Sequence, residues 1–141
     1  MIDITMQGLE QVKKDFREMQ KRIGTPKVMM DALGGQGMKN VVQHFGAEEG
    51  PLGPWKPLKH PRRSGGGGIL KDTGRLRAAT RFRTVNSTEA HVFNQTTYAA
   101  VHNFGSFEKN IPQRKFMWVD PKTRETMRKA MIRWVLKGMA N

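Results

Sequence analysis

The sequence predicts an α+β domain in which helices pack on an antiparallel β-sheet, with long helices near both ends and two extended loops. Its 141 residues are enough for one domain, here residues 1–141. Apolar residues change along the chain from the two-residue spacing of strands to the three-and-four spacing of helices. Proline and glycine cluster in two places, which indicates extended loops at residues 46–68 and 105–114 within that domain.

The first part of the chain predicts a strand and two helices. Alternating apolar residues over 2–6 indicate a short strand. Helical spacing follows from residue 9 until Gly24 ends the helix, and Thr25–Pro26 then begins a second helix, which runs to about Phe45. Three glycines, each costing roughly 1 kcal/mol relative to alanine, interrupt this second helix, so we expect a weakened, bent or broken middle at Gly34, Gly35 and Gly37.

The 46–68 loop combines four prolines with an unbroken glycine run over 65–68. Structureless loops longer than about 12 to 15 residues are uncommon in compact domains unless they are functional or become ordered on binding. Trp55 and Leu58 are expected to pin the base of the loop to the core. The glycine run is not a phosphate-binding P-loop, because no Gly-Lys-Ser/Thr sequence follows it.

The segment that follows predicts a capped helical turn and a hairpin. Asp72 or Thr73 can accept the N–H groups of a short helical turn at residues 72–77. Residues 81–85 and 90–94 are β-prone and flank a turn, which predicts an antiparallel hairpin with arginines on one face.

The last third predicts a short helix over residues 97–104, ended by Gly105, and a final strand over 115–119. Asp120–Pro121 is an N-cap followed by proline at the first helical position, so a helix should run to about Lys137. Its expected buried stripe is Met127, Met131, Trp134, Val135 and Met139.

Charge is distributed unevenly along the chain, whose formal net charge is +13. Residues 1–50 sum to zero, whereas residues 51–84 sum to +8 and residues 109–137 to +7. This asymmetry indicates an acidic partner, either nucleic acid, an anionic membrane surface or an acidic protein face. The alternative is a basic surface that serves only solubility.

No catalytic or cofactor-binding pattern is present in the sequence. The chain has no cysteine, which excludes thiol chemistry and cysteine-based metal sites. Its four histidines lack metal-binding spacing, and we expect His44 on a helix surface and His102 packed and hydrogen-bonded. No apolar run is long enough to span a bilayer, so we expect no membrane partner and synthesis in a cytoplasm. The expectation is a protein that is not an enzyme and needs no metal or cofactor.

Four short motifs, in this order and spacing, together resemble the phage virion morphogenesis, or tail completion, family of Mu-like tailed phages. They are Glu49–Leu58, Ile69–Arg77, Tyr98–Gly105 and Ile111–Phe116. Two positions differ from the common family pattern, which has proline at the position of Lys115 and serine at that of Ala79.

The resemblance implies a structural subunit of the virion neck, which completes the tail and joins it to the head as part of a homo-oligomeric ring. It also implies neighbouring neck and tail proteins as partners, contact with packaged DNA, and a stay in the host cytoplasm during assembly. The alternative is a small basic nucleic-acid-binding module, which the charge alone also allows.

The resemblance also suggests roles for individual residues. Those expected in a basic loop that faces DNA or an acidic protein, with a slight preference for DNA, are Lys56, Lys59, Arg62, Arg63, Lys71, Arg75 and Arg77. Those expected as loop and interface anchors are Trp55, Leu58, Asp72, Thr73, Tyr98, His102, Phe104 and Phe116. Within this second set, Asp72 and Thr73 would cap a turn, and Tyr98, His102 and Phe104 would join the sheet to the following helix.

Overall fold

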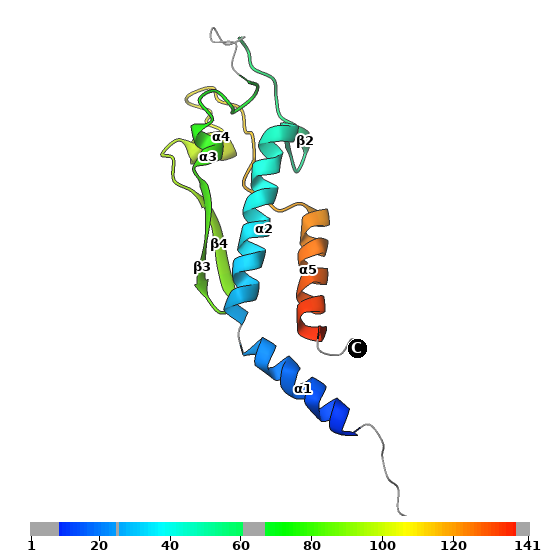
Figure 1. The fold of residues 1–141 in the computed structure, drawn as a ribbon. Coiled ribbons are helices and arrows are strands. Elements are labelled where there is room, and N and C mark those ends of the chain that lie inside the picture. The colour runs from blue at the N-terminus through cyan, green and yellow to red at the C-terminus, as the bar shows by residue number, and fades with distance from the viewer. Residues whose placement is uncertain (1–8, 25, 61–66, 138–141) are drawn as a thin grey trace, which may run out of the picture.

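A computed structural model describes residues 9–24, 26–60 and 67–137 (Figure 1). The helices are α1 (Leu9–Ile23), α2 (Pro26–Ala47), α3 (Arg75–Ala78), α4 (Ala99–Phe104) and α5 (Pro121–Leu136). The strands are β1 (Glu49–Gly50), β2 (Gly53–Pro54), β3 (Thr80–Asn86) and β4 (Glu89–Asn94). The α+β fold class is therefore confirmed, while the strand predicted at residues 2–6 lies outside the described residues.

Helix α2 forms the centre of the molecule. The β3–β4 hairpin lies along one side of it and α5 along the other, while α1 leaves the body at an angle from the end where α2 begins (Figure 1). The β1–β2 hairpin, α3 and α4 gather at the opposite end. Each strand pair is antiparallel, and the two pairs form separate sheets instead of the one larger sheet that was predicted.

Helix α2 is continuous from Pro26 to Ala47, so the prediction is wrong as far as a broken middle is concerned. A Cβ atom on Gly34 would lie 2.5 Å from Cδ2 of Phe82, and one on Gly37 would lie 3.2 Å from Cγ2 of Val92. These two glycines are buried beneath the β3–β4 hairpin. Their low helix propensity is outweighed because the absence of a side chain lets the hairpin pack directly on the helix.

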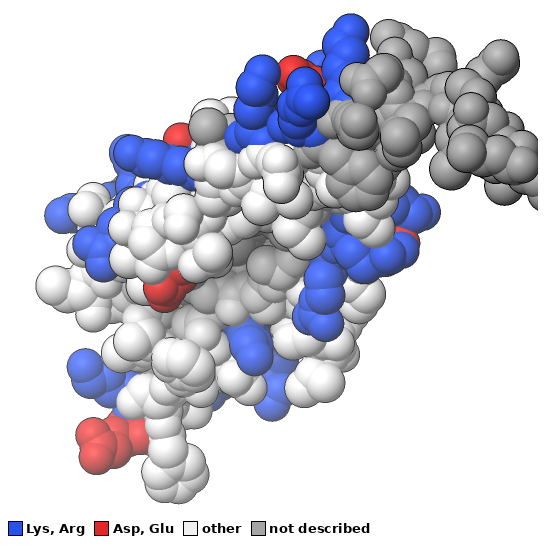
Figure 2. Space-filling view, turned by 90° about the horizontal axis from the view of Figure 1, so that it is seen from below, with Lys and Arg blue, Asp and Glu red and all other residues white. Residues whose placement is uncertain are grey.

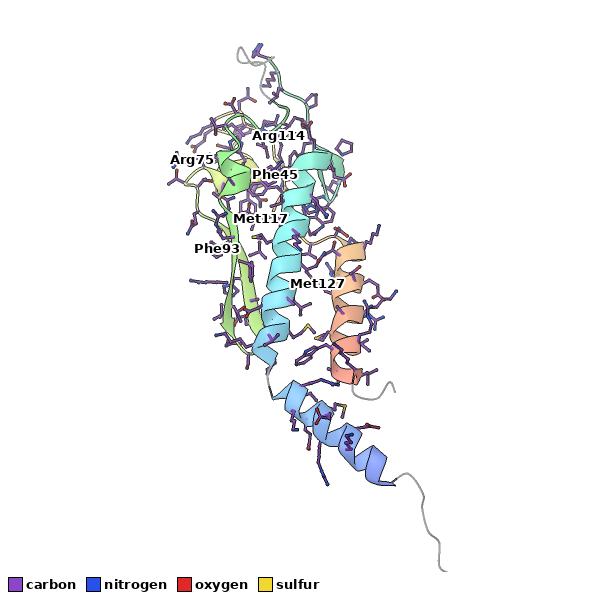
Figure 3. The ribbon with its side chains drawn as sticks, viewed as in Figure 1. Phe45, Arg75, Phe93, Arg114, Met117 and Met127 are labelled. Carbon is purple, nitrogen blue, oxygen red and sulfur yellow. The ribbon has the colours of Figure 1, made fainter. Side chains whose placement is uncertain are left out.

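The hydrophobic core is concentrated at the end where α2 stops. Phe45 and Phe116 are fully buried, with ring centroids 5.0 Å apart, and Trp55 meets the Phe45 ring edge-on at 5.9 Å. Figure 3 shows Phe45 and Met117 at this end and Met127 between α2 and α5. The buried cluster consists of Val41, Phe45, Trp55, Ile69, Leu70, Leu76, Ala99 and Phe116.

Residues 115–119 do not form the predicted strand, because side chains take the hydrogen bonds that a neighbouring strand would take. Oδ1 of Asn103 accepts from the backbone N–H groups of Phe116, at 3.1 Å, and of Met117, at 2.9 Å. Oδ1 of Asn40 accepts from the N–H of Asp120 at 3.1 Å. The segment is thereby fastened to α2 and α4 without a strand ladder.

The C-terminal half otherwise follows its local sequence signals. The β3–β4 hairpin has the predicted exposed arginines, Arg81 and Arg83. Asp120 caps α5 by accepting from the N–H of Thr123 at 2.7 Å. The predicted buried stripe of α5 is only partly buried, since Met131 is 41% exposed, and Met139 lies outside the described residues.

Candidate functional site

The first predicted loop is folded against its own chain from Glu49 to Leu58, whereas Lys59 and His60 are exposed. Its start forms the β1–β2 hairpin, in which Glu49 pairs with Pro54 and Gly50 with Gly53. The indole Nε1 of buried Trp55 then donates to the carbonyl of Lys115 at 3.3 Å. Leu58 is half-buried and packs against the core cluster. The expectation of a loop without regular structure is therefore wrong for its first part.

The second predicted loop, residues 105–114, is also ordered by its own chain. Ser106 and Ile111 exchange two backbone hydrogen bonds, of 2.8 and 2.9 Å. Between them, the N–H of Asn110 donates to the carbonyl of Phe107 at 3.0 Å. The turn starts at Gly105, whose φ of 80° is a left-handed conformation that glycine adopts without strain. The loop is a tight, hydrogen-bonded turn.

Arg114 joins the two loops, although its side chain is buried (Figure 3). Its Nε donates to the carbonyl of Lys56 at 3.0 Å, and one terminal guanidinium nitrogen donates to the carbonyl of Pro57 at 3.3 Å. Its backbone N–H donates to the carbonyl of His102 at 2.9 Å. Sequence reasoning counted Arg114 only as one more basic residue, and its place in the Ile111–Phe116 motif was the available signal.

Of the residues predicted as one basic loop, Lys71, Arg75 and Arg77 line one hollow, and Lys56 and Lys59 line another. Lys56, Lys59, Arg75 and Arg77 are exposed, whereas Arg62 and Arg63 lie outside the described residues. Nζ of Lys71 is instead 2.8 Å from Oε1 of Glu48, in a half-buried ion pair. Figure 2 views the molecule from the opposite end, where α2 begins, and shows Lys and Arg in several separate groups there.

Glu48 connects the end of α2 to the segment that follows the first loop. Its Oε1 also accepts from the backbone N–H of Ile69 at 3.0 Å. The hydrogen bond from Lys71 is the main reason that the pKa of Glu48 lies below its usual value; burial opposes this effect and the Ile69 N–H reinforces it. Lys71 therefore has a structural partner within its own chain.

The predicted capping motif occupies a different place in its helix. The N-cap of α3 is Gly74, in a left-handed conformation with φ of 70°, and it makes no side-chain cap. Thr73 lies one residue earlier, and its Oγ1 accepts from the N–H of Arg75 at 3.3 Å. Asp72 is exposed.

The structure brings four of the predicted anchors together. Asp72, Thr73, Tyr98 and His102 line one hollow of about 490 Å³. The rings of Tyr98 and His102 meet edge to face, with centroids 5.8 Å apart. Phe104 does not join them, because it is 69% exposed beside the second loop.

His44 is buried, so its predicted place on the helix surface is wrong. A carbonyl oxygen can only accept, so Nδ1 of His44 donates to the carbonyl of Phe116 at 3.0 Å. Its ring stacks on Trp118 with centroids 4.6 Å apart. The available signal was helical spacing, because His44 shares the face of the buried Val41 and neighbours the buried Phe45.

Asp120 belongs to a polar network that fixes the start of α5. Its carboxylate accepts from the backbone N–H and the hydroxyl of Thr123, at 2.7 and 2.9 Å, and from the side-chain amide of Asn40. Burial is the largest single influence and would raise the pKa of Asp120. The hydrogen bonds from Thr123 and Asn40 together outweigh burial and lower the pKa below its ordinary value of 3.8.

The lowered pKa predicts an acid-dependent contribution of Asp120 to stability. A carboxyl group whose pKa is lower when folded stabilises the protein fully above its unfolded pKa, and this stabilisation is lost as the pH falls through the folded pKa. Asp120→Asn should therefore lower the free energy of unfolding by about 1 kcal/mol at pH 7, because its amide would face the amide of Asn40 and the hydrogen bond between them would be lost. The difference should shrink below pH 3.8. Urea denaturation of both proteins from pH 7 to pH 2.5 measures it, and a difference independent of pH contradicts the assignment.

The end of the molecule that carries the two loops presents exposed apolar side chains. Among residues 9–24, 26–60 and 67–137, no cluster of three or more His, Asp or Glu side chains could hold a metal ion. None of the described helices is long and apolar enough to cross a membrane. Three large apolar side chains project from the two loops. Leu52 is 97% exposed, Phe104 is 69% exposed and Phe107 is fully exposed.

Comparison with known proteins agrees with the motifs in these loops. Residues 7–136 match the model of the phage virion morphogenesis family. The match covers nearly the whole chain and every described helix and strand. Comparisons with curated proteins and with solved structures found no match. The family is structural and is not known for catalysis. The chain therefore belongs to the phage virion morphogenesis family, and its role is a structural one in assembling the bacteriophage virion.

Proposed function

We propose that this protein is a non-catalytic subunit of the phage neck, which completes the tail and joins it to the head as one copy in a homo-oligomeric ring. The observation that carries the proposal is the rigid end formed by the two family-motif loops. Arg114 clamps both loops through the carbonyls of Lys56 and Pro57. Exposed apolar side chains in contiguous patches are typical of surfaces that contact other proteins.

The fixed conformation of the two loops makes them suitable for assembly. Hydrogen bonds within the chain already hold the β1–β2 hairpin and the Ser106–Ile111 turn in place. Binding through a preformed surface loses less conformational entropy than binding through a flexible one. In a closed ring each interface is heterologous, so one patch of a copy meets a different patch of the next copy.

Imaging and mass measurement of the purified full chain test this proposal. Native mass spectrometry and negative-stain electron microscopy would be applied to the protein alone and mixed with tails from a phage that lacks its gene. We expect rings of uniform copy number at the ends of the tails. A protein that stays monomeric and never associates with tails would contradict the proposal.

The second candidate function is a small basic nucleic-acid-binding module, favoured by the net charge of +13 and by the exposed Arg75 and Arg77. Such a module would bind duplex DNA with an affinity that falls linearly with salt on logarithmic axes, because neutralised phosphates release counterions. The neck protein would bind DNA weakly at most. A fluorescence anisotropy titration at several salt concentrations distinguishes the two functions. Contact with packaged DNA inside an assembled neck is compatible with the weak binding.

A further inference from the structure

We propose that the end of the molecule carrying the two loops docks onto an acidic protein of the neck or tail through two preformed apolar projections, Leu52 and Phe107. We call this the loop-tip surface; it consists of Leu52, Phe104 and Phe107 with the two hollows beside them. The inference rests on the proposed function. It names the surface and the chemistry of the partner, neither of which follows from membership of the family.

Both projections stand on turns whose backbone is fixed. Leu52 occupies the β1–β2 turn, where Gly50 pairs with Gly53 and Gly53 has a φ of 105°. Phe107 lies in the turn closed by the two Ser106–Ile111 hydrogen bonds. A large apolar side chain at a rigid tip loses little backbone entropy on binding, and aromatic anchors of this kind dominate the energy of many interfaces.

The two tips belong to one continuous surface. The hollow beside Phe107 has a volume of about 980 Å³ and that beside Leu52 about 610 Å³. Lys56 and Gln113 line both hollows, so the hollows adjoin. Because Arg114 holds the carbonyl of Lys56, the two tips keep a fixed spacing.

The charge of this surface indicates the chemistry of its partner. The side chains that line the two hollows include three lysines, Lys56, Lys59 and Lys115, and no carboxylate. A complementary surface would have apolar pockets for Leu52 and Phe107, with carboxylates placed opposite the lysines.

A second copy of this chain fits that description poorly. Another copy has 25 Lys and Arg against 12 Asp and Glu, so it offers few carboxylates to the three lysines. Six carboxylates of the described residues are already engaged within the chain: Glu18 with Lys21, Asp31 with Thr84, Glu48 with Lys71, Glu89 with His91, Asp120 with Thr123 and Glu125 with Arg128. A different, acidic protein therefore suits the lysines better. Duplex DNA would meet the lysines but would offer no apolar pocket to Leu52.

The test compares tail binding by single variants of the full chain. Tails isolated from a phage that lacks this gene are titrated with the purified wild type, Leu52→Ser, Phe107→Ser and Lys56→Glu, and bound protein is measured by co-sedimentation. The affinity of each variant for tails should be at least about tenfold lower than that of the wild type. The matched controls should bind like the wild type: Val85→Ser, another exposed apolar residue, and Lys27→Glu, the same charge change at the opposite end of α2.

Two further measurements separate the possible outcomes. The melting temperatures of Leu52→Ser and Phe107→Ser should equal that of the wild type, because both side chains are exposed. Unchanged tail binding by the variants overturns the inference while the neck assignment stands. Loss of ring formation without loss of tail binding overturns it in favour of a contact between copies, and an effect confined to binding of a duplex oligonucleotide overturns it in favour of DNA. Failure of the wild type to bind tails contradicts the proposed function itself.

Discussion

Replacing Asn103 by alanine is expected to lower the free energy of unfolding by about 3 kcal/mol, the largest effect of any single change considered for this protein. Asn103 is 5% exposed, and its Oδ1 accepts from the N–H groups of Phe116 and Met117. The shorter side chain would leave both donors without an acceptor beside the fully buried Phe116. Each orphaned buried donor costs about 1 to 3 kcal/mol. Urea denaturation at pH 7 measures the loss.

Asn103→Asp separates this cause from general disturbance of the packing. Aspartate has nearly the same shape and keeps an oxygen that can accept from Phe116 and Met117. It should therefore lose clearly less stability than the alanine variant, although a charge is buried. Equal losses for both variants would show that the two hydrogen bonds do not hold the 115–119 segment.

Local signals were sufficient for most helices and for the main hairpin. Gly24 ends α1 and Asp120–Pro121 begins α5 where the sequence indicated, because a helix end depends on a few adjacent residues. The β3–β4 hairpin follows for the same reason, since its strands flank a short turn. The existence and type of these elements could therefore be predicted from the sequence.

The 115–119 segment could not be predicted, because its hydrogen-bond partners come from distant parts of the chain. The distant residues that hydrogen-bond with this segment or with Asp120 are Asn40, His44, Trp55 and Asn103. Its own sequence is β-prone, and no local rule shows that side chains will replace a neighbouring strand. The buried clamp of Arg114 has the same origin, because its acceptors belong to Lys56 and Pro57.

The candidate site was predictable only in part. The motifs led to Trp55 and Phe116, which the structure places in the core. They did not reveal Leu52 and Phe107 as projections. Leu52 and Leu58 are the same residue type within one motif, yet Leu52 is 97% exposed and Leu58 packs on the core cluster. The turn geometry of β1–β2 makes the difference, and it depends on contacts with Trp55 and Lys115.

Replacing Gly34 by alanine is expected to destabilise the protein by about 1 kcal/mol, the opposite of the effect that helix propensity alone predicts. In an open helical position alanine is better than glycine by about 1 kcal/mol. At Gly34 the new methyl group would lie 2.5 Å from Cδ2 of Phe82 and 3.3 Å from Cβ of Ala90. The β3–β4 hairpin would have to move away from α2, and overpacking of this kind costs about 1 to 3 kcal/mol. Thermal and urea denaturation measure the change.

Gly46→Ala is the matched control, because Gly46 lies in the same helix and a Cβ there would have no atom within 4 Å. It should stabilise the protein by about 1 kcal/mol, so the same chemical change at two positions of α2 should differ by about 2 kcal/mol. Gly35 provides an intermediate case, since the nearest Phe82 atoms would be 3.8 Å away, an ordinary contact distance. If Gly34→Ala stabilised the protein as much as Gly46→Ala, Gly34 would only lower the helix propensity of α2. The inference that it lets the β3–β4 hairpin pack directly on the helix would then be wrong.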